Sequence, residues 1–296
     1  MFPESVRPSI ESVVGEVRGV RSVGGGDVSS AARVETSRGA FFAKWNAGAG
    51  GDSFEAEAEG LAALAEASGR GADGPLIVPR PLLAQNRTAE TPGVLVLPWL
   101  ERGRASGEDG RRFGRALADL HRASAPGEGY GWARDNWIGS KPQRNGWTAD
   151  WPAFFGERRL LAQAETVRQR GAWRAEWDAP LNRLVARLGE ILPERPPRSV
   201  LHGDLWAGNA LALSDGRFAL IDPAVYVGHR EADLAMTELF GGFGAAFYDG
   251  YREAWPLEPG YSERREVYNL FHLTNHLTHG PGYASSVASV LRRFAS

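Results

Sequence analysis

The stretch from Ser199 to Asp222 restricts the fold of this chain more than any other part of the sequence. It opens with a short apolar run, Val200 and Leu201, that predicts a buried strand leading into a polar loop. That loop carries three side chains that can bind or orient a ligand: His202, Asp204 and Asn209. A second apolar run, residues 218–221, leads directly to the acid at position 222. The pattern predicts two strands that deliver polar side chains from their ends to one place.

The spacing of the loop residues, His-x-Asp-x-x-x-x-Asn, is typical of a phosphotransferase catalytic loop. In such loops the Asp accepts the proton of the attacking hydroxyl, so we predict Asp204 as the general base. We predict Asn209 and Asp222 as Mg²⁺ ligands, because oxygen donors from two strand ends can hold a hard cation against a nucleotide phosphate. A single Asp in a loop would carry little information, but the order and spacing of the whole set are specific.

Two further residues are predicted to support the loop. His202 precedes the predicted base, and Asp233 begins a helix beyond the second strand. Asp233 either braces the catalytic loop or only caps its own helix. A third candidate, His121, shares an apolar helical face with Phe113 and Leu117, so we interpret it as a packed structural histidine.

Composition limits the classes of protein and of site. With 296 residues, 43% of them hydrophobic, the chain can form one large domain or two lobes. The net charge of −2 gives no reason to expect nucleic acid or an anionic membrane as a partner, and no run of about 18 apolar residues predicts a span. Cysteine is absent, which excludes disulfides, thiolate catalysis and zinc–thiolate sites. The N-terminus lacks signal-peptide features, so we expect a cytoplasmic protein.

The first part of the chain predicts a helix followed by a small antiparallel sheet. Four aliphatic residues recur at helical spacing within residues 8–20: Ile10, Val13, Val14 and Val17. This spacing predicts a short amphipathic helix from near Ser9, weakened by a glycine inside it. Residues 21–45 then alternate around two turns, which predicts three antiparallel strands.

Three consecutive glycines lie at the first turn of this sheet: Gly24, Gly25 and Gly26. Backbone N–H groups at such a turn can approach phosphates, so we predict a nucleotide contact, although three glycines alone more often form only a turn. Lys44 supports the prediction, because it lies on the third strand, where kinases place their phosphate-binding lysine. Only Lys44 and Lys141 are lysine among the 34 basic residues, and a compact ammonium suits a tight phosphate site better than an arginine fork.

An acid on the next predicted helix is the expected partner of Lys44. Four residues fall on one face of that helix: Phe54, Glu57, Leu61 and Leu64. A carboxylate in an apolar stripe needs a partner, so we predict a Lys44–Glu57 ion pair at the nucleotide phosphates. In the alternative interpretation, Glu55, Glu57 and Glu59 are all solvated.

The predicted division into lobes follows the apolar strand at residues 93–97, which ends at Pro98. We predict a nucleotide-binding lobe over residues 1–97, a hinge over 98–101 and a catalytic and substrate-binding lobe over 102–296. Backbone groups beside Pro98 are available for an adenine, because proline cannot donate to a neighbouring strand. The predicted contact residues are Leu97, Trp99 and Leu100.

The second lobe reads as largely helical, with an aromatic, glycine-rich insert at residues 127–152. Long ordered loops are usually functional, and the polar residues Asn136 and Gln143 are predicted to bind substrate hydroxyls. Six of the ten Trp lie between positions 132 and 177, where packing is a simpler role for them than sugar stacking. His272 and His276 have a zinc-compatible spacing, but no further ligand accompanies them.

Several segments together resemble the fructosamine kinase family, a branch of the aminoglycoside-phosphotransferase-like kinases. The closest resemblances are residues 202–209 (HGDLWAGN), 220–226 (LIDPAVY) and 230–242 (READLAMTELFGG). Residues 135–140 and 247–252 resemble the family as well, and the likeness runs from about Gly24 to Tyr283. This sequence departs from the family pattern at Ala207, His229 and Trp45.

The resemblance implies an α+β, bilobal, protein-kinase-like fold with a small antiparallel-sheet lobe and a larger helical lobe. It implies ATP- and Mg²⁺-dependent phosphorylation of a ketosamine, a sugar joined to an amine, at its 3-hydroxyl, with deglycation as the biological role. It also implies Asp204 as base, Asn209 and Asp222 as metal ligands, and Trp206 as a wall of the substrate pocket. The implied partner is a small ketosamine or glycated amine, and the chain is expected to act as a monomer.

Two other functions remain open on the sequence. One is a kinase of the same superfamily that acts on an aminoglycoside, choline or another amino alcohol; such substrates call for an acidic pocket, which the Trp-rich insert does not suggest. The other is an inactive nucleotide- or sugar-binding protein, in which at least one of the five central residues would usually be lost. ATP consumption with and without a fructosamine separates all three.

Overall fold

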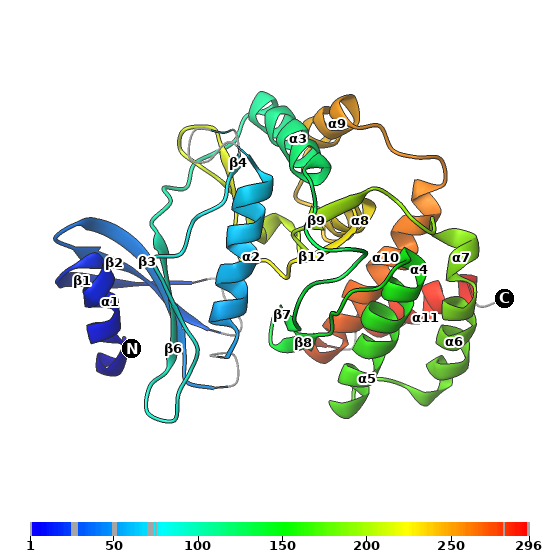
Figure 1. Cartoon of the computed structure of the whole chain (residues 1–296), viewed down its shortest axis with the longest axis horizontal. Helices are drawn as coiled ribbons and strands as arrows, with labels where there is room; N and C mark the ends of the chain where they lie inside the picture. Colours follow the sequence, from blue (N-terminus) through cyan, green and yellow to red (C-terminus); the bar gives the residue numbers. More distant parts are fainter. Residues whose placement is uncertain are drawn as a thin grey trace.

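The first lobe is built on a five-stranded antiparallel sheet. The computed structural model describes residues 2–24, 29–48, 52–69, 74, 76–280 and 282–294. The strand order is β1 (Val17–Val23), β2 (Ser30–Thr36), β3 (Gly39–Asn46), β6 (Gly93–Pro98) and β5 (Leu83–Gln85). Helix α1 (Arg7–Val14) packs on one face of the sheet, and helix α2 (Phe54–Ala67) lies between the sheet and the second lobe (Figure 1).

Side chains alternate along the two central strands, so one face of the sheet packs against α1 and the other against α2. On β6, Val94 and Val96 pack toward α1, whereas Leu95 and Leu97 pack with α2 and the second lobe. On β3, Trp45 points toward α1 and its neighbour Lys44 toward the opposite face, because successive side chains alternate across a strand. The pleat thus places the lysine beside α2.

Helix α1 is shorter than the sequence predicts. It ends at Val14, because Gly15 follows with φ +81, and β1 begins at Val17. The expected helix over residues 8–20 is therefore wrong in its second half. A left-handed glycine is a common helix stop, and here it outweighs the helical spacing of Val17.

The second lobe is mainly helical, as predicted, which confirms the α+β class. Its helices of eight or more residues are α3 (Gly107–Arg122), α5 (Ala162–Gln169), α6 (Asp178–Ala186), α8 (Glu231–Leu239), α9 (Ala245–Ala254), α10 (Tyr261–His276) and α11 (Gly282–Phe294). The shorter helical elements are η1 (Glu4–Val6) in the first lobe and α4 (Trp151–Phe154), the π-helix η4 (Phe155–Leu161), η5 (Ala175–Trp177), α7 (Leu188–Ile191), η6 (Ala207–Asn209) and η7 (Leu277–His279) in the second. Within the described ranges, no helix has the length and apolarity needed to cross a membrane.

Small sheets within this lobe carry the polar loops. Strand β9 (Arg198–Leu201) pairs with β12 (Tyr226–His229), and β11 (Phe218–Leu220) lies between β10 (Ala210–Ala212) and β4 (Leu76–Ile77). The insert forms a hairpin of β7 (Asn136–Ile138) and β8 (Lys141–Gln143). Since β4 pairs with β11, residues 76–77 join the second lobe although they precede the predicted boundary.

Glycines allow α3 and α9 to pack closely. A Cβ at Gly114 would lie 2.0 Å from the carbonyl oxygen of Phe247, and one at Gly250 would lie 2.1 Å from that of Arg111. No side chain fits at either position without separating the helices. The tight pair fixes the position of His121 near the C-terminal end of α3, behind the polar loop that follows β9.

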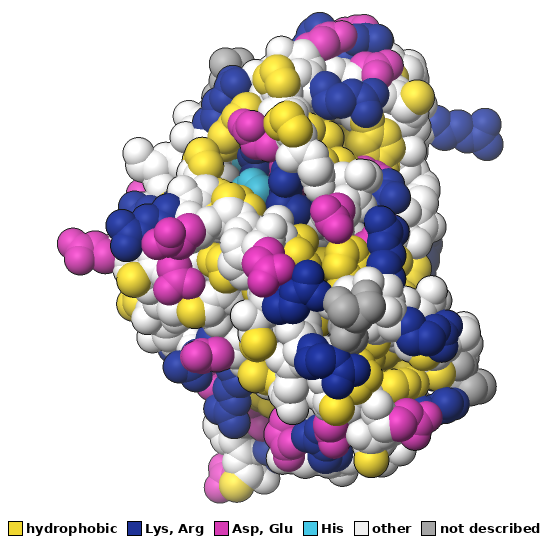
Figure 2. Space-filling model, turned by 90° about the vertical axis from the view of Figure 1, so that its right-hand side faces the viewer, with side chains coloured by type: hydrophobic (Ala, Val, Ile, Leu, Met, Phe, Trp, Pro, Cys, Tyr) yellow, Lys and Arg dark blue, Asp and Glu magenta, His cyan; other side chains and the backbone are white. Residues whose placement is uncertain are grey.

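The face of the second lobe shown in Figure 2 mixes charges of both signs with apolar patches, without a large field of one sign.

Candidate active site

The polar loop after β9 is held from behind by Asp233 on α8. One oxygen of this carboxylate accepts the backbone N–H of His202 at 2.7 Å, and the other accepts that of Gly203 at 2.9 Å. The buried His121 ring is hydrogen-bonded to the same carboxylate at 3.2 Å and to the Tyr251 hydroxyl at 2.9 Å. Burial alone would raise the pKa of Asp233, but the His121 and backbone contacts lower it. Of the two alternatives weighed for Asp233, bracing of the loop is the one that fits this geometry.

His202 joins the ends of the two strands. Its Nε2–H donates to the carbonyl of Ile221 at 2.9 Å, and its Nδ1 accepts the N–H of Asp204 at 3.3 Å. Burial lowers the pKa of His202, which favours the neutral ring that this acceptor role requires. Gly203 adopts φ +80, and a Cβ there would lie 2.0 Å from the carbonyl oxygen of Ala224. The loop therefore needs both a buried neutral histidine and a glycine.

Asp204 and Asn209 meet at the front of this loop. The Asn209 amide donates to the Asp204 carbonyl at 2.9 Å and lies 3.3 Å from the Asp204 carboxylate. Because the amide nitrogen makes these contacts, its oxygen is left for another partner. Burial raises the pKa of Asp204 to about 7, and the Asp222 carboxylate adds to the shift. The geometry thus brings the predicted base and one predicted metal ligand together.

A lysine–carboxylate cluster connects the two lobes. The ammonium of Lys44 lies 2.7 Å from a Glu57 oxygen and 2.7 Å from an Asp222 oxygen. The predicted ion pair is therefore confirmed, and the interpretation in which Glu57 is solvated is wrong. Burial alone would lower the pKa of Lys44, but the charges of Asp222 and Glu57 raise it, so the amine stays protonated. Asp222 is the one non-glycine residue with positive φ (+52) among the described residues, a strained geometry typical of functional sites.

Trp206 follows the predicted base by two residues, and 40% of its surface is exposed. The indole packs over Gly208, where a Cβ would lie 2.2 Å from the ring. A side chain at position 208 would displace the indole, so this glycine sets the direction of the exposed aromatic face. Ala207, one of the departures from the family pattern, lies against Gly242, whose own Cβ would be 2.4 Å from the alanine methyl.

The predicted nucleotide contacts are described only in part. Gly24 follows β1 directly and has open space around it, whereas Gly25 and Gly26 lie outside the described residues. Leu97 lies on the sheet face that meets α2, and Leu100 packs against the β4–β11 sheet. The indole of Trp99 donates to Glu101 at 2.7 Å and stacks under the Arg33 guanidinium at 4.9 Å.

The two polar residues predicted to read substrate hydroxyls have a different role. Asn136 and Gln143 are 6% and 2% exposed. The Asn136 amide donates to the carbonyl of Val225 at 2.7 Å, and the Gln143 amide donates to that of Ala224 at 2.9 Å. The substrate-binding assignment of both was wrong. Their side-chain N–H groups donate to buried backbone carbonyls after Asp222 and do not face a substrate. They attach the insert to the segment that carries this acid.

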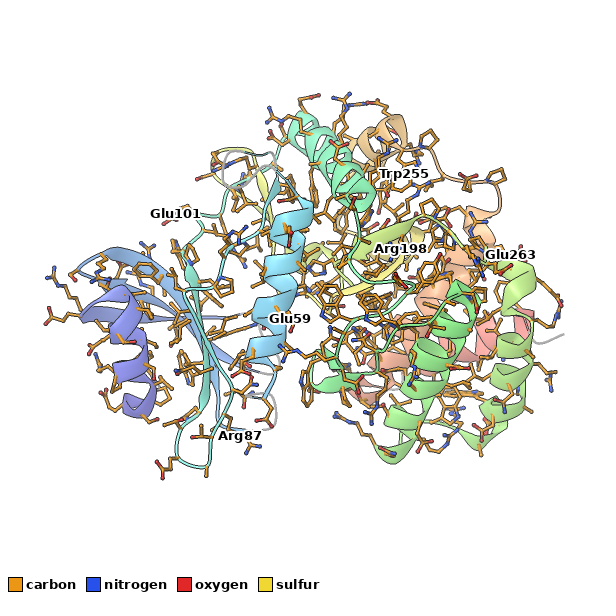
Figure 3. All side chains as sticks on the ribbon, in the orientation of Figure 1. Glu59, Arg87, Glu101, Arg198, Trp255 and Glu263 are labelled. Atoms are coloured by element: carbon orange, nitrogen blue, oxygen red, sulfur yellow. The ribbon has the colours of Figure 1, made fainter. Side chains whose placement is uncertain are left out.

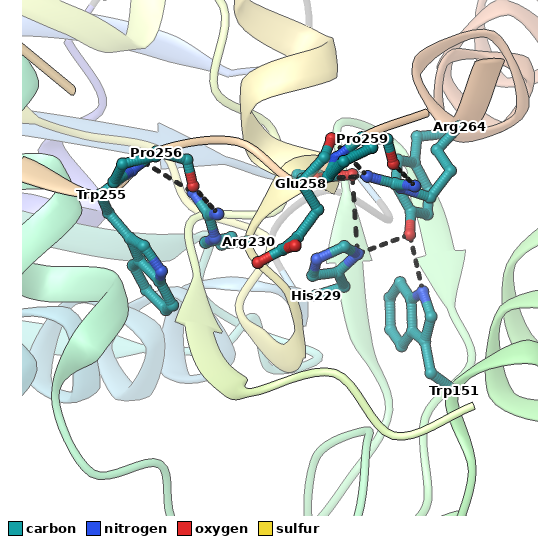
Figure 4. A network of polar contacts seen from close by, with 10 residues as sticks. Trp151, His229, Arg230, Trp255, Pro256, Glu258, Pro259 and Arg264 are labelled. Carbon is teal, nitrogen blue, oxygen red and sulfur yellow. Dashed lines mark hydrogen bonds and ion pairs between the residues drawn. The ribbon is translucent and has the colours of Figure 1, made fainter. Parts of the chain in front are cut away.

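Sequence reasoning missed a buried network that holds the start of α8 (Figure 4). The Tyr268 hydroxyl is hydrogen-bonded to the His229 ring at 2.8 Å and to the Trp151 indole at 2.9 Å. Arg264 binds Glu231 through two contacts of 2.6 and 2.8 Å. Because Glu231 and Asp233 share α8, the network fixes the residue that braces the catalytic loop. No local pattern could reveal these contacts, since the partners are 33 or more residues apart.

His272 and His276 lie one helical turn apart on α10. The His276 ring is hydrogen-bonded to the carbonyl of His272 at 2.8 Å, one helical turn earlier. In the part of the chain that the structure describes, no group of three His, Cys, Asp or Glu is placed to hold a metal ion. His272 itself is buried, and burial lowers its pKa to about 3.

The sequence profile of the fructosamine kinase family matches residues 6–296. The chain belongs to this family. A probable ketoamine kinase of Synechocystis is 40% identical over 92% of this chain and 89% of its own length. A chloroplastic protein-ribulosamine 3-kinase of Oryza sativa is 38% identical over 93% of this chain and 78% of its own length. The predicted kinase activity is therefore confirmed, and the chain is a phosphotransferase.

Solved structures agree with the family assignment. A Thermobifida fusca protein assigned as a fructosamine-3-kinase superimposes with a TM-score of 0.85, at 32% identity over 98% of both chains. An aminoglycoside phosphotransferase in complex with AMP-PNP and hygromycin B has a TM-score of 0.64 at 16% identity, over 98% of this chain and 96% of its own. The second likeness concerns the fold alone, and it confirms the predicted kinase-like architecture.

Proposed function

We propose that this kinase transfers the γ-phosphoryl group of ATP to a sugar hydroxyl of a ketosamine, at the 3-hydroxyl. The observation that carries the proposal is an exposed aromatic side chain, Trp206, in the same loop as Asp204 and hydrogen-bonded to its backbone carbonyl at 3.1 Å. Asp204 in turn lies close to Asp222 of the Lys44–Glu57–Asp222 cluster. A phosphoryl-transfer site needs a base, a phosphate-binding cation and oxygen ligands for Mg²⁺, and these residues can supply all three. The aromatic face adds a surface suited to the apolar side of a sugar ring.

In the proposed reaction, the Asp204 carboxylate accepts the proton of the sugar hydroxyl while the hydroxyl oxygen bonds to the γ-phosphorus. The bond between that phosphorus and the β,γ-bridging oxygen breaks, and ADP leaves. Lys44 binds the phosphates, and Glu57 orients its ammonium. His202 and Asp233 keep the loop in place through the hydrogen bonds described above.

Mg²⁺ fits the residues of this site. Asn209 has an amide oxygen available, and Asp222 uses one carboxylate oxygen for Lys44 while 48% of its side chain is exposed. Mg²⁺ is commonly held by one or two protein oxygens together with phosphates and water, so these two residues would bind it between the loop and the nucleotide. The ion would neutralise charge on the phosphates during transfer.

We place the adenine along the end of β6 and the chain that follows it, at Leu97, Trp99 and Leu100, with residues 98–101 as the hinge between the lobes. Support comes from Leu97, which lies on the face of the sheet that meets α2 and the second lobe. Gly24, with open space around it, is available for the phosphate end of the nucleotide. The same phosphate contact is proposed for Gly25 and Gly26, which lie outside the described residues.

The ketosamine assignment follows the names of the relatives, which are ketoamine and ribulosamine kinases. The insert supports it over a polycationic aminoglycoside, because it holds only three acids and two of them are already paired. Asp135 binds Arg144 at 2.7 Å and the backbone of Asn145 at 2.7 Å, and Asp150 caps α4 through Ala153 at 2.9 Å. Phosphorylation would destabilise the ketosamine linkage and release the amine, so the biological role would be deglycation.

A panel of acceptors tests the assignment. Purified protein with ATP and Mg²⁺ should phosphorylate a small fructose- or ribose-derived ketosamine, with kanamycin and choline as competing acceptors. Trp206→Ala should raise the KM for the ketosamine by about tenfold or more, with a smaller effect on ATP. Gly208→Ala, which displaces the same indole without removing it, is the matched variant and should act in the same direction. Rapid phosphorylation of kanamycin with no transfer to any ketosamine would overturn the proposal.

A further inference from the structure

A second acid on α2 binds the C-terminal lobe. Glu59 lies two residues after Glu57, and it accepts the indole N–H of Trp132 at 2.9 Å. The guanidinium of Arg134 forms an ion pair with the other oxygen of the same carboxylate. Figure 3 shows Glu59 where α2 meets the second lobe. Both partners belong to the insert, so this contact joins the two lobes outside the lysine cluster.

The insert gives Trp132 a fixed base. The preceding residue, Gly131, exchanges two backbone hydrogen bonds with Val227 on β12, of 2.9 and 2.7 Å. A Cβ at Gly131 would lie 2.0 Å from the carbonyl oxygen of Gly146, so the insert is closed tightly at this point. The amides of Asn136 and Gln143 then attach the hairpin to the carbonyls of residues 224 and 225, as described above. Trp132 is consequently anchored to the chain between Asp222 and Asp233.

Helix α2 is thus held from two sides. Glu57 and Glu59 are two residues apart, about 200° around a helix, so they project in nearly opposite directions. One meets Lys44 on the sheet, and the other meets Trp132 on the insert. The residue after Glu59, Gly60, faces the segment after Asp222, and a Cβ there would lie 3.0 Å from a Val225 methyl. The helix has little freedom to turn while both contacts exist.

We propose that Trp132, Arg134 and Glu59 form an interlobe latch that fixes α2 on the second lobe and so presents Glu57 to Lys44. The latch residues are positioning residues: they reach the nucleotide only through Glu57. The inference rests on the proposed role of Lys44 and Glu57 at the nucleotide phosphates. Trp132 is the stronger member, because it is 8% exposed, whereas the Arg134 side chain is 53% exposed and its ion pair is screened by solvent.

Steady-state kinetics of four variants test the latch. Trp132→Phe keeps the aromatic packing and removes the donor, and Glu59→Ala removes both contacts. Each should raise the KM for ATP by about tenfold, the loss expected for one hydrogen bond to a charged group, with an unchanged KM for the ketosamine. Glu59→Gln keeps an acceptor for the indole and should recover most of the affinity, and Arg134→Gln should change it less than about threefold.

Hydrogen exchange separates positioning from folding. Amides of α2 should exchange faster in Trp132→Phe, while those of α10 keep their protection. Glu66→Gln is the matched control, because Glu66 is an exposed acid on the same helix, and no hydrogen bond or ion pair of its side chain is found within the described ranges. Lower thermal stability of Trp132→Phe and Glu59→Ala with wild-type ATP binding would overturn the proposal. Titration with a non-hydrolysable ATP analogue needs no acceptor, so a wrong ketosamine assignment would leave this test intact.

Discussion

The replacement Asp233→Asn removes half of the brace behind the catalytic loop. The native carboxylate accepts two backbone N–H groups, from His202 at 2.7 Å and from Gly203 at 2.9 Å. An asparagine has one oxygen, so in either orientation its NH₂ group faces one of these donors. The side chain is 2% exposed, which leaves no water to take over the lost bond.

The expected cost follows from these contacts. A buried donor without a partner costs about 1–3 kcal/mol, and the remaining hydrogen bonds lose the strength that the negative charge gives them. We expect about 2–4 kcal/mol less stability, a large part of the about 5–15 kcal/mol that holds a domain together. Asp204 follows Gly203 directly, so a loosened loop should also lower kcat, by about 10–100-fold.

Urea unfolding and initial rates with a ketosamine measure the two effects on one sample. Glu263→Gln is the control, since Glu263 is an exposed acid in the first turn of α10 and should change stability by less than about 0.5 kcal/mol. A variant at position 233 with the wild-type unfolding midpoint and the wild-type kcat would refute the idea that this carboxylate holds the loop.

Three other replacements have defined outcomes. Lys44→Met should raise the KM for ATP and lower kcat by about 100-fold in rate assays, because two carboxylates lose their cation; wild-type kinetics would contradict its role. Arg159→Met should lower the free energy of unfolding by about 1–3 kcal/mol in urea, because the guanidinium binds Asn145 at 2.8 Å and stacks 3.9 Å from the Tyr226 ring; an unchanged midpoint would refute this. Lys141→Met should stabilise the protein at pH 7, because burial lowers the pKa of Lys141 from 10.5 to about 8. Between pH 8 and pH 10.5 the lysine is protonated in the unfolded chain and neutral in the folded one. The stability that Lys141→Met gains over wild type, about 3 kcal/mol at most, should therefore shrink from pH 8 to pH 10. A stability difference that does not change with pH would contradict this.

Local patterns in the sequence were sufficient for the parts of the site that lie close together in the chain. The spacing of Asp204 and Asn209 placed both on one loop, and helical periodicity selected Glu57 over its neighbours. Contacts between distant segments left no such signal. The Lys44–Asp222 contact joins residues 178 positions apart, and it depends on how the lobes pack.

Polar residues in the insert were misread for a physical reason. A polar loop suggests solvent and ligands, but the buried amides of Asn136 and Gln143 donate to the backbone carbonyls of residues 225 and 224. Arg159 was equally hidden, since a fully buried arginine that stacks on Tyr226 and binds the carbonyl of Arg144 has no sequence signature. Gly15 shows the opposite case, in which one residue with left-handed φ ends a helix that periodicity would extend.

Asp204→Asn tests the central claim most directly. The variant keeps the shape of the loop and removes the group proposed to accept the hydroxyl proton. Phosphate transfer from ATP to a small ketosamine, followed by ³¹P NMR, should give a 3-phosphorylated sugar with the wild-type protein and a rate about 10²–10⁴-fold lower with the variant. Binding of a non-hydrolysable ATP analogue should remain within about twofold of wild type. Near-wild-type transfer by the variant would contradict the assignment of Asp204 as the base of a ketosamine kinase.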